Sequence, residues 1–374
     1  MTSGAHDDDG ARAVPFADLG ALHAPLAAAL DAAARRVLAS GRFILGEEVA
    51  AFERELAAAL GVARAVGVSS GTDALLTLLL AHDVAPGDEV VTTTLSFFAT
   101  AGAIMRVGAR PIFADVEPDT LNVDEARAIA VLSARTKAVV VVHLFGRVAR
   151  TGALAAACAS RGIPLLEDAA QAIGATSVGA ARGRAAALSF FPSKNLGGFG
   201  DGGAVVTDDD AIADRVALLR AHGAAARMRH VAIGGNFRLD ELQAALLRVK
   251  LPHLPRWTER RRAHARLYRA ALAGLPLRLP PDDAGCVWNQ FVVRVGDGRR
   301  DALSRALAAR RIATAIYYPT PLHLQPALAG LGHRAGAFPE AEAAAGDVLA
   351  LPVAAELDDG AIERVCVAVR AYFG

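Results

Sequence analysis

Hydrophobic residues recur with a helical period early in the chain. In EEVAAFERELAAALG, Val49, Phe52, Leu56 and Leu60 are three or four residues apart, and Gly61 follows the last of them. This spacing lines one face of a helix, and glycine is a common residue just past a helix end. The pattern predicts an amphipathic helix that closes at Gly61.

Beyond this helix, short apolar runs alternate with helical segments. The runs end in small polar residues and read ARAVGVSS, EVVTTTLSF, AVVVVHLF and IPLLED; the segments between them read TDALLTLLLAH, ATAGAIMRVG and TGALAAACASRG. Continuous apolar strands alternating with helices are typical of a mostly parallel sheet covered on both faces. We therefore predict an α/β fold, in which ligands bind at the carboxyl ends of the strands.

The second half of the chain predicts a smaller α+β unit. Residues 239–273 have a helical pattern that Pro252 and Pro255 interrupt, which suggests a domain boundary. A strand (CVWNQFVVRV), a helix (DALSRALAARR), a second strand (IATAIYY) and a closing helix (DDGAIERVCVAVRAYF) follow. The expected division is a disordered tail at 1–13, a large domain at 14–254 and a small C-terminal domain at 255–374.

Composition narrows the class of function. Of the 374 residues, 53% are hydrophobic, yet no apolar run approaches the roughly 18 residues of a membrane span. The acidic start, MTSGAHDDDG, lacks the basic and apolar regions of a signal peptide, so we expect a cytoplasmic protein. Because the net charge is +1 without a basic block, we expect no nucleic-acid partner. Chemistry on a small molecule is the better expectation.

The cysteines predict neither disulfides nor a metal site. Cys158, Cys286 and Cys366 are widely spaced in apolar contexts and form no CxxC motif. No group of histidines and carboxylates has the spacing of metal ligands. We interpret the three cysteines as core residues and expect no metal.

Two of the predicted strands end in residues suited to ligand binding. Ser69 to Thr72 lie where a strand turns into a helix, so free N–H groups could hold an anion. Taken alone, the motif favours the alternative, an ordinary helix cap formed by Ser70 or Thr72. Glu167 and Asp168 end another apolar strand, where a shielded carboxylate needs a cationic partner. A metal would need further ligands, for which His143 is the only other candidate on a neighbouring strand end. The remaining candidate for a cationic partner is a positively charged ring of a bound ligand.

Lys194 is an exception in a chain rich in arginine. Only Lys137, Lys194 and Lys250 are lysines among 40 Lys and Arg residues. Lys194 follows a predicted strand and precedes a glycine-rich stretch, NLGGFGDGG. This stretch leads into another strand rather than a helix, so it matches neither a Walker loop nor a dinucleotide-binding loop. A lysine amine, unlike a guanidinium, can form a Schiff base. The alternative is a surface cation, which is how we interpret Lys137 and Lys250.

Together these features describe a site for pyridoxal phosphate. The site has an anion cradle, an acid for the pyridinium nitrogen and a Schiff-base lysine. Phe97, at a further strand end, could stack on the ring, and Gln171 could hydrogen-bond its hydroxyl; plain packing would equally explain both residues.

Seven motifs along the chain resemble those of a known family. SGTDAL, TLSFFATAGAI, EDAAQAIGA, SFFPSKNLGGFGDGGAVVT, GGNFRLDELQAALL, YYPTPLHLQP and LALP, in this order, resemble the DegT/DnrJ/EryC1/StrS family of nucleotide-sugar aminotransferases. The resemblance runs from about Val14 to the C-terminus. It implies a fold type I aminotransferase, with a mostly parallel seven-stranded sheet flanked by helices and a smaller C-terminal α+β domain.

The resemblance also implies a role for individual residues. Lys194 would form the Schiff base with pyridoxal 5'-phosphate, and Asp168 would pair with its pyridinium nitrogen. The further cofactor contacts implied are Gly71, Thr72 and Ser189 on the phosphate, Phe97 on the ring face, Gln171 on the ring hydroxyl, and Asn236 on the phosphate of the neighbouring subunit. Asn236 therefore implies a homodimer with shared active sites. Tyr317 and His323 match positions near the sugar nucleotide.

The implied reaction is transfer of an amino group from L-glutamate to a keto sugar linked to dTDP or UDP. A dehydratase branch of the family has histidine in place of the Schiff-base lysine, so Lys194 favours transamination. The YYPTPLHLQ and WNQFVVRV segments resemble members that act on 3-keto rather than 4-keto sugars. The alternatives are a dehydratase of this family and a non-catalytic regulatory protein that binds the cofactor.

Overall fold

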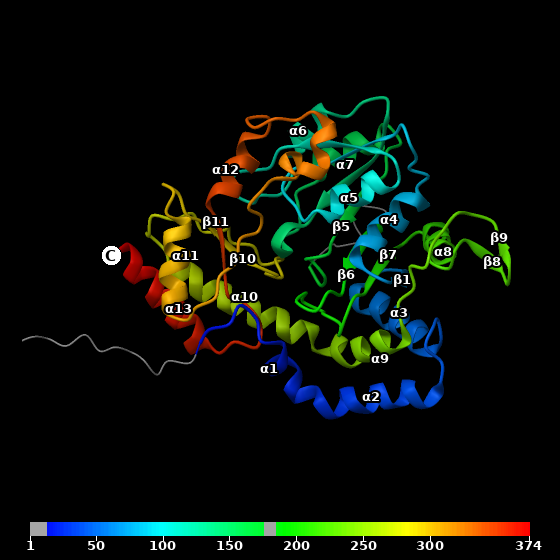
Figure 1. Ribbon diagram of the computed structural model, residues 1–374, viewed down its shortest axis with the longest axis horizontal. Coiled ribbons are helices and arrows are strands. Elements are labelled where there is room, and N and C mark those ends of the chain that lie inside the picture. Colours follow the sequence, from blue (N-terminus) through cyan, green and yellow to red (C-terminus); the bar gives the residue numbers. More distant parts are fainter. Residues whose placement is uncertain (1–12, 176–184) are drawn as a thin grey trace, which may run out of the picture.

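A seven-stranded sheet lies at the centre of the computed structural model, which describes residues 13–175 and 185–374 (Figure 1). Its strands, in spatial order, are β1 (Arg64–Val68), β7 (Gly203–Thr207), β6 (Ala185–Ser189), β5 (Leu165–Asp168), β4 (Thr136–Val142), β2 (Glu89–Thr93) and β3 (Arg110–Ala114). Only β7 runs against its neighbours. The sheet is therefore mostly parallel, as the sequence predicts.

Helices cover both faces of this sheet because alternate strand residues enter different cores. Val140 packs in one core, whereas Val139 and Val141 pack in another on the opposite face. The face of Val140 is covered by α4 (Gly71–Ala81), α5 (Ala99–Arg106) and α8 (Asp210–Leu219). The other face is covered by α3 (Glu47–Leu60), α6 (Glu125–Ala130), α7 (Gly152–Ala159) and α9 (Glu241–Lys250). Burial on both sides explains why these strands are continuously apolar.

The predicted amphipathic helix is confirmed as α3. It buries Val49, Phe52 and Leu56, and Gly61 follows it with φ 69°. The helix α2 (Ala27–Ser40) covers the outer side of α9, using Leu30, Ala33 and Val37. The preceding elements are α1 (Leu19–His23) and η1 (Ala24–Leu26).

A second core lies in the C-terminal part of the chain. There β10 (Phe291–Arg294) pairs antiparallel with β11 (Val348–Leu351), and the helices α10 (Leu254–Ala271), α11 (Arg300–Ala309) and α13 (Asp359–Phe373) pack beside them. The predicted interruption is the short η3 (Leu251–His253), which contains Pro252 and joins α9 to α10. Val14 packs in this second core and bonds to Arg311 and Ala313. Residues 1–12 of the expected tail lie outside the described residues.

One predicted strand is wrong. IATAIYY, residues 312–318, forms only isolated bridges: Ile312 pairs with Val14, and Ala315 pairs with Ala350. The strand that pairs with β10 is instead β11, which contains the LAL residues that the sequence analysis quoted as part of a motif but did not predict to be a strand. Residues 312–318 cannot form a continuous ladder because they lead from the second core to the edge of the large sheet, where Tyr317 and Tyr318 line a cleft.

The remaining elements are short connections at the surface or between the two cores. They are η2 (Leu144–Gly146), β8 (Ala224–Ala226), β9 (Arg229–His230), η4 (Leu322–Leu324), η5 (Pro326–Leu331) and α12 (Pro339–Asp347). Cys158, Cys286 and Cys366 are buried and free, as expected of core residues. In residues 13–175 and 185–374, no helix has the length and apolar character to cross a bilayer.

Candidate active site

The carboxyl edge of the sheet opens into a cleft of about 580 Å³. Because β1, β2, β4, β5 and β6 are parallel, their carboxyl ends meet at this edge. Of the residues that the sequence analysis assigns to a site, the structure brings the following to the cleft wall: Gly71, Thr72, Phe97, Asp168, Gln171, Ser189, Lys194 and Tyr317. Segments that are distant in the sequence thus converge on one site.

The first part of the cleft is the turn between β1 and α4. Ser70 caps α4, since its Oγ accepts the Asp73 N–H at 3.0 Å. Gly71 and Thr72 lie in the first helical turn, where N–H groups have no intrahelical carbonyl and the helix dipole favours an anion. Ser70 is therefore the helix cap, and the N–H groups of Gly71 and Thr72 remain suited to a phosphate.

Glycine allows this turn to approach β6 across β7. A Cβ atom on Gly203, in β7, would lie 2.4 Å from the Ser70 carbonyl oxygen. A Cβ atom on Gly71 would lie 2.7 Å from the Ser189 Cβ. Such distances exclude any side chain at either position without a shift of the backbone. The close approach places Ser189 beside the N-terminus of α4, so both can contact one anion.

Asp168 ends β5 at the floor of the cleft and is only 5% exposed. Its Oδ2 accepts a hydrogen bond from the Thr100 hydroxyl at 2.7 Å, and its Oδ1 accepts one from the Ala170 N–H at 3.2 Å. Burial raises the pKa of Asp168, and these two hydrogen bonds act in the opposite direction. A cation placed against this carboxylate would stabilise its ionised form.

Thr100 is a residue that the sequence analysis missed. It is buried in α5, and its Oγ lies 3.0 Å from the Ser96 Oγ, four residues earlier. We expect Thr100→Val to slow the reaction of the cofactor-loaded enzyme with an amino donor by about 10- to 100-fold, because one hydrogen bond to a charged group contributes about 1.5–3 kcal/mol. Single-turnover absorbance measures this rate. Thr100→Ser keeps the hydroxyl and should remain near the wild-type rate; equal loss in both variants would contradict the role of the hydroxyl.

Lys194 reaches the same cleft from the turn after β6. Burial lowers its pKa below that of an ordinary lysine, while the nearby Asp168 carboxylate acts in the opposite direction. Deprotonation of the Lys194 amine therefore requires less alkaline conditions than usual. A neutral amine can act as a nucleophile or a base.

An aromatic wall and an amide face this pair. Phe97 is 59% exposed, and its ring centroid lies 6.3 Å from that of Tyr318. Gln171 accepts a hydrogen bond from the Phe145 N–H at 2.6 Å and donates one to the Tyr318 hydroxyl at 3.2 Å. Burial raises the pKa of Tyr318, which keeps its hydroxyl protonated. Gln171 and Tyr318 thus form a polar pair at the cleft wall.

His323 and Asn236 are not among the residues that line the cleft. His323 is buried, with Nδ1 2.6 Å from the Thr94 Oγ and Nε2 3.0 Å from Glu342. Through these two contacts His323 links Thr94, which directly follows β2, to α12, the helix before β11. Asn236 is exposed, and its Oδ1 accepts a hydrogen bond from the Arg238 Nε at 2.8 Å. Neither side chain contributes to the cleft wall.

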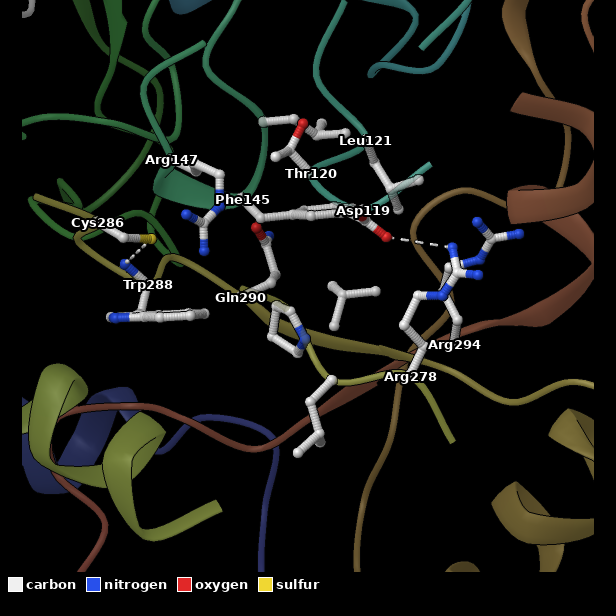
Figure 2. A pocket seen from close by; sticks show the side chains of 14 residues that line it. Asp119, Thr120, Leu121, Phe145, Arg147, Arg278, Cys286, Trp288, Gln290 and Arg294 are labelled. Carbon is white, nitrogen blue, oxygen red and sulfur yellow. Dashed lines mark hydrogen bonds and ion pairs between the residues drawn. The ribbon is translucent and has the colours of Figure 1, made fainter. Parts of the chain in front are cut away.

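A smaller cavity of about 20 Å³ (Figure 2) shares Gln290 with the cleft wall. Three arginines line it, but Arg147 pairs with Asp283, Arg278 with Asp119 and Arg294 with Asp347. Its cations are thus already neutralised. The described residues contain no group of three potential metal ligands.

The cleft wall also contains residues to which the sequence analysis gave no role, although they lie in segments that it identified. They are Gln290, Ile316, Tyr318, Phe191, Ser193 and Asp201. Ser193 and Asp201 lie within the motif around Lys194, so their position in the sequence could have indicated them. Gln290 and Ile316 depend on how the second core packs against the sheet, which no local pattern specifies.

Several characterised relatives align with nearly the whole chain. The dTDP-3-amino-3,4,6-trideoxy-alpha-D-glucose transaminase of Streptomyces venezuelae is 43% identical, over 96% of this chain and 96% of its own. The UDP-N-acetyl-3-dehydro-alpha-D-glucosamine 3-aminotransferase of Acidithiobacillus ferrooxidans is 42% identical, over 96% and 97%. A pleiotropic regulatory protein of Geobacillus stearothermophilus is 43% identical, over 96% and 98%.

A solved structure agrees closely with the fold. The crystal structure of S. venezuelae DesV in complex with a ketimine intermediate superposes with a TM-score of 0.94 at 43% identity, and the match covers 97% of this chain and 99% of that one. The model of the DegT/DnrJ/EryC1/StrS aminotransferase family matches residues 26–370. The fold, the cleft and these similarities together show that the chain belongs to the DegT/DnrJ/EryC1/StrS aminotransferase family.

Proposed function

We propose that this protein transfers an amino group from L-glutamate to the 3-keto group of a hexose linked to dTDP or UDP. The observation that carries this proposal is the convergence of Lys194, Asp168 and the N-terminus of α4 on one cleft. The 3-position and the two nucleotides are supported by the names of the S. venezuelae and A. ferrooxidans relatives.

The cleft fits pyridoxal 5'-phosphate, the cofactor of this family. Gly71, Thr72 and Ser189 would hold the phosphate, where no side chain obstructs the turn. Asp168 would pair with the ring nitrogen, since a buried carboxylate favours a cationic partner. Phe97 would stack on the ring, and the Gln171 amide would contact the ring hydroxyl. When bound, pyridoxal phosphate supplies a carbonyl for amines and a ring that withdraws electrons from the reacting carbon.

In this proposal Lys194 holds the cofactor and then moves a proton. Once an amino donor had displaced it, the Lys194 Nζ would be placed to take the proton from the donor's α-carbon. The lowered pKa of Lys194 favours the neutral amine that this step needs. Asp168, which accepts hydrogen bonds from Thr100 and the Ala170 N–H, would hold a negative charge against the ring nitrogen.

Isotope transfer tests this function directly. We expect ¹⁵N from labelled L-glutamate to appear on carbon 3 of a dTDP- or UDP-linked 3-keto hexose, observed by NMR. The corresponding 4-keto sugar is the control. If ¹⁵N appeared only on carbon 4 of the 4-keto sugar, the proposed 3-position would be wrong, but the proposed transamination would still hold.

Two other functions would give different products. A dehydratase would release a dehydrated sugar without retaining ¹⁵N, but it would have histidine where this chain has Lys194. A regulatory protein would bind the cofactor and react with no amino donor; the name of the G. stearothermophilus relative is the observation that favours this second candidate. The labelled product separates all three.

We further propose that the active unit is a homodimer. Asn236 lies in an exposed region next to the β8–β9 hairpin, where Met228 is 88% and Ile233 93% exposed. Such apolar exposure favours a covering partner. In addition, Lys194 is the one cation among the described residues that line the cleft, whereas the cofactor and the nucleotide both carry phosphates. A second copy could supply the missing polar contacts.

Mixing two impaired variants tests whether the active sites are shared between subunits. We expect Lys194→Ala to be inactive and Asn236→Asp to be weakened, because its carboxylate would repel the cofactor phosphate of the neighbouring subunit. Mixed dimers of the two variants should regain activity, since one of their two sites then has neither defect. Sedimentation monitors the assembly. Absence of any gain in verified mixed dimers would contradict the sharing of Asn236.

A further inference from the structure

Lys250 is a buried lysine outside the cleft wall. The sequence analysis interprets it as a surface cation, and the structure shows that this is wrong: Lys250, the last residue of α9, is 0% exposed. Burial of an ammonium group costs free energy that an alkyl side chain would not, so its contacts need an explanation.

The groups in contact with the Lys250 ammonium are neutral, and the Glu356 carboxylate acts against the effect of burial on the Lys250 pKa. Its Nζ donates a hydrogen bond to the Gly197 carbonyl and lies 2.8 Å from the His23 Nε2. The rings of Phe199 and Trp257 lie 5.2 Å and 5.9 Å from Nζ. Burial lowers the pKa of Lys250 to about 8, and burial together with the Lys250 charge lowers that of His23 to about 4. Near neutral pH, a charged Lys250 therefore donates to a neutral imidazole.

The carbonyl that Lys250 holds belongs to the turn that carries Lys194. In this turn the Lys194 N–H bonds to the Phe191 carbonyl at 2.8 Å, and the Gly198 N–H bonds to the Phe190 carbonyl at 2.7 Å. The turn closes so tightly at Gly197 that a Cβ atom there would lie 2.0 Å from the Pro192 carbonyl oxygen. Displacement of Gly197 would thus move the backbone around Lys194.

The helix α9 contacts this turn at a second point. The Gln243 Oε1 accepts a hydrogen bond from the Phe199 N–H at 2.8 Å. Gln243 and Lys250 lie on the same helix, which packs on the sheet in one of the main cores. The turn is therefore fixed to a rigid element, and the bond from Lys250 is its charge-assisted contact.

We propose that Lys250 is a positioning residue that holds the 192–198 turn through the Gly197 carbonyl and so fixes the direction in which Lys194 enters the cleft. This inference rests on the proposed role of Lys194. Arginine, the usual cation of this chain, has a planar fork suited to bidentate partners rather than to a single carbonyl between two rings.

Lys250→Met tests the proposal, with Lys137→Met as the matched control. Methionine retains much of the apolar volume but cannot donate. We expect the single-turnover reaction of the cofactor-loaded variant with L-glutamate to slow by about tenfold, with KM for glutamate changed by less than about twofold, because orientation rather than binding is impaired. Amide hydrogen exchange in residues 194–199 should become faster, and exchange in α4 should not change. Lys137→Met should match the wild type in both measurements.

Other outcomes would overturn the inference. If Lys250→Met reacted with glutamate at the wild-type rate, the inference would be wrong even if amide exchange in the turn became faster, because the turn would then not orient Lys194. If Lys250→Met does not fold, His23→Leu removes the second Nζ partner and should give smaller changes in the same direction; an unchanged rate and exchange in this variant would refute the role of Lys250. If the wild type itself fails to react with glutamate, the proposed function is at fault, and the exchange measurement still tests whether Lys250 holds the turn.

Discussion

Replacement of Lys194 by arginine is expected to lower turnover by on the order of 10⁴-fold or more. Arginine keeps the positive charge and a similar length, but its guanidinium stays protonated and forms no Schiff base with a carbonyl. The proposed proton transfer also needs a neutral amine, which the lowered pKa of Lys194 favours. The measurement is the initial rate of ¹⁵N transfer from L-glutamate to the keto sugar.

Two controls make the Lys194→Arg result specific. Lys137→Arg changes the same residue type on β4 and should keep the wild-type rate. Thermal unfolding should show that Lys194→Arg folds, since Lys194 lies in a cleft rather than in a packed core. Repeated turnovers by a folded Lys194→Arg variant would mean that another group forms the bond to the cofactor.

Asp168→Asn should have the second largest effect, a loss of about 10³-fold in the rate with L-glutamate. An amide has nearly the shape of the carboxylate and can still accept the Thr100 hydrogen bond, but it carries no negative charge. Without this charge the ring nitrogen of the cofactor loses its proton more readily, and the ring then withdraws electrons less strongly. Single-turnover absorbance with saturating glutamate measures this step apart from binding.

Asp201 provides the matched control for Asp168. It also lines the cleft, but it is exposed. Asp201→Asn should therefore change the same rate by less than about tenfold, since an exposed charge is well screened. If Asp168→Asn reacted as fast as Asp201→Asn, the pairing of Asp168 with the ring nitrogen would be wrong.

The part of the site on strand ends could be predicted from the sequence. Ser70 to Thr72, Phe97, Asp168 and Ser189 all follow apolar runs, and the carboxyl ends of parallel strands meet at one edge. Lys194 was recognisable because lysine is rare in this chain. For the residues at strand ends, the fold class alone predicts that they lie close together.

Other features depend on contacts between distant segments. Lys250 is buried because Gly197 and His23, 53 and 227 residues away, provide its partners. The expected strand at 312–318 fails because this segment leads from the second core to the cleft and meets β11 only through Ala315. His323 matches a family motif, yet it bonds to Thr94 and Glu342 and does not line the cleft. No local pattern indicates such partners, because they are set by how the two cores pack.

The absorbance spectrum of the cofactor-loaded protein, recorded before and after addition of L-glutamate, tests the central claim most directly. We predict a visible band from the cofactor bound to Lys194, its replacement by a near-ultraviolet band of the aminated cofactor, and recovery of the visible band with 2-oxoglutarate. A visible band that glutamate does not change would contradict glutamate as the donor and favour a regulatory protein or another chemistry. Absence of any visible band after reconstitution would contradict the assignment of Lys194 itself.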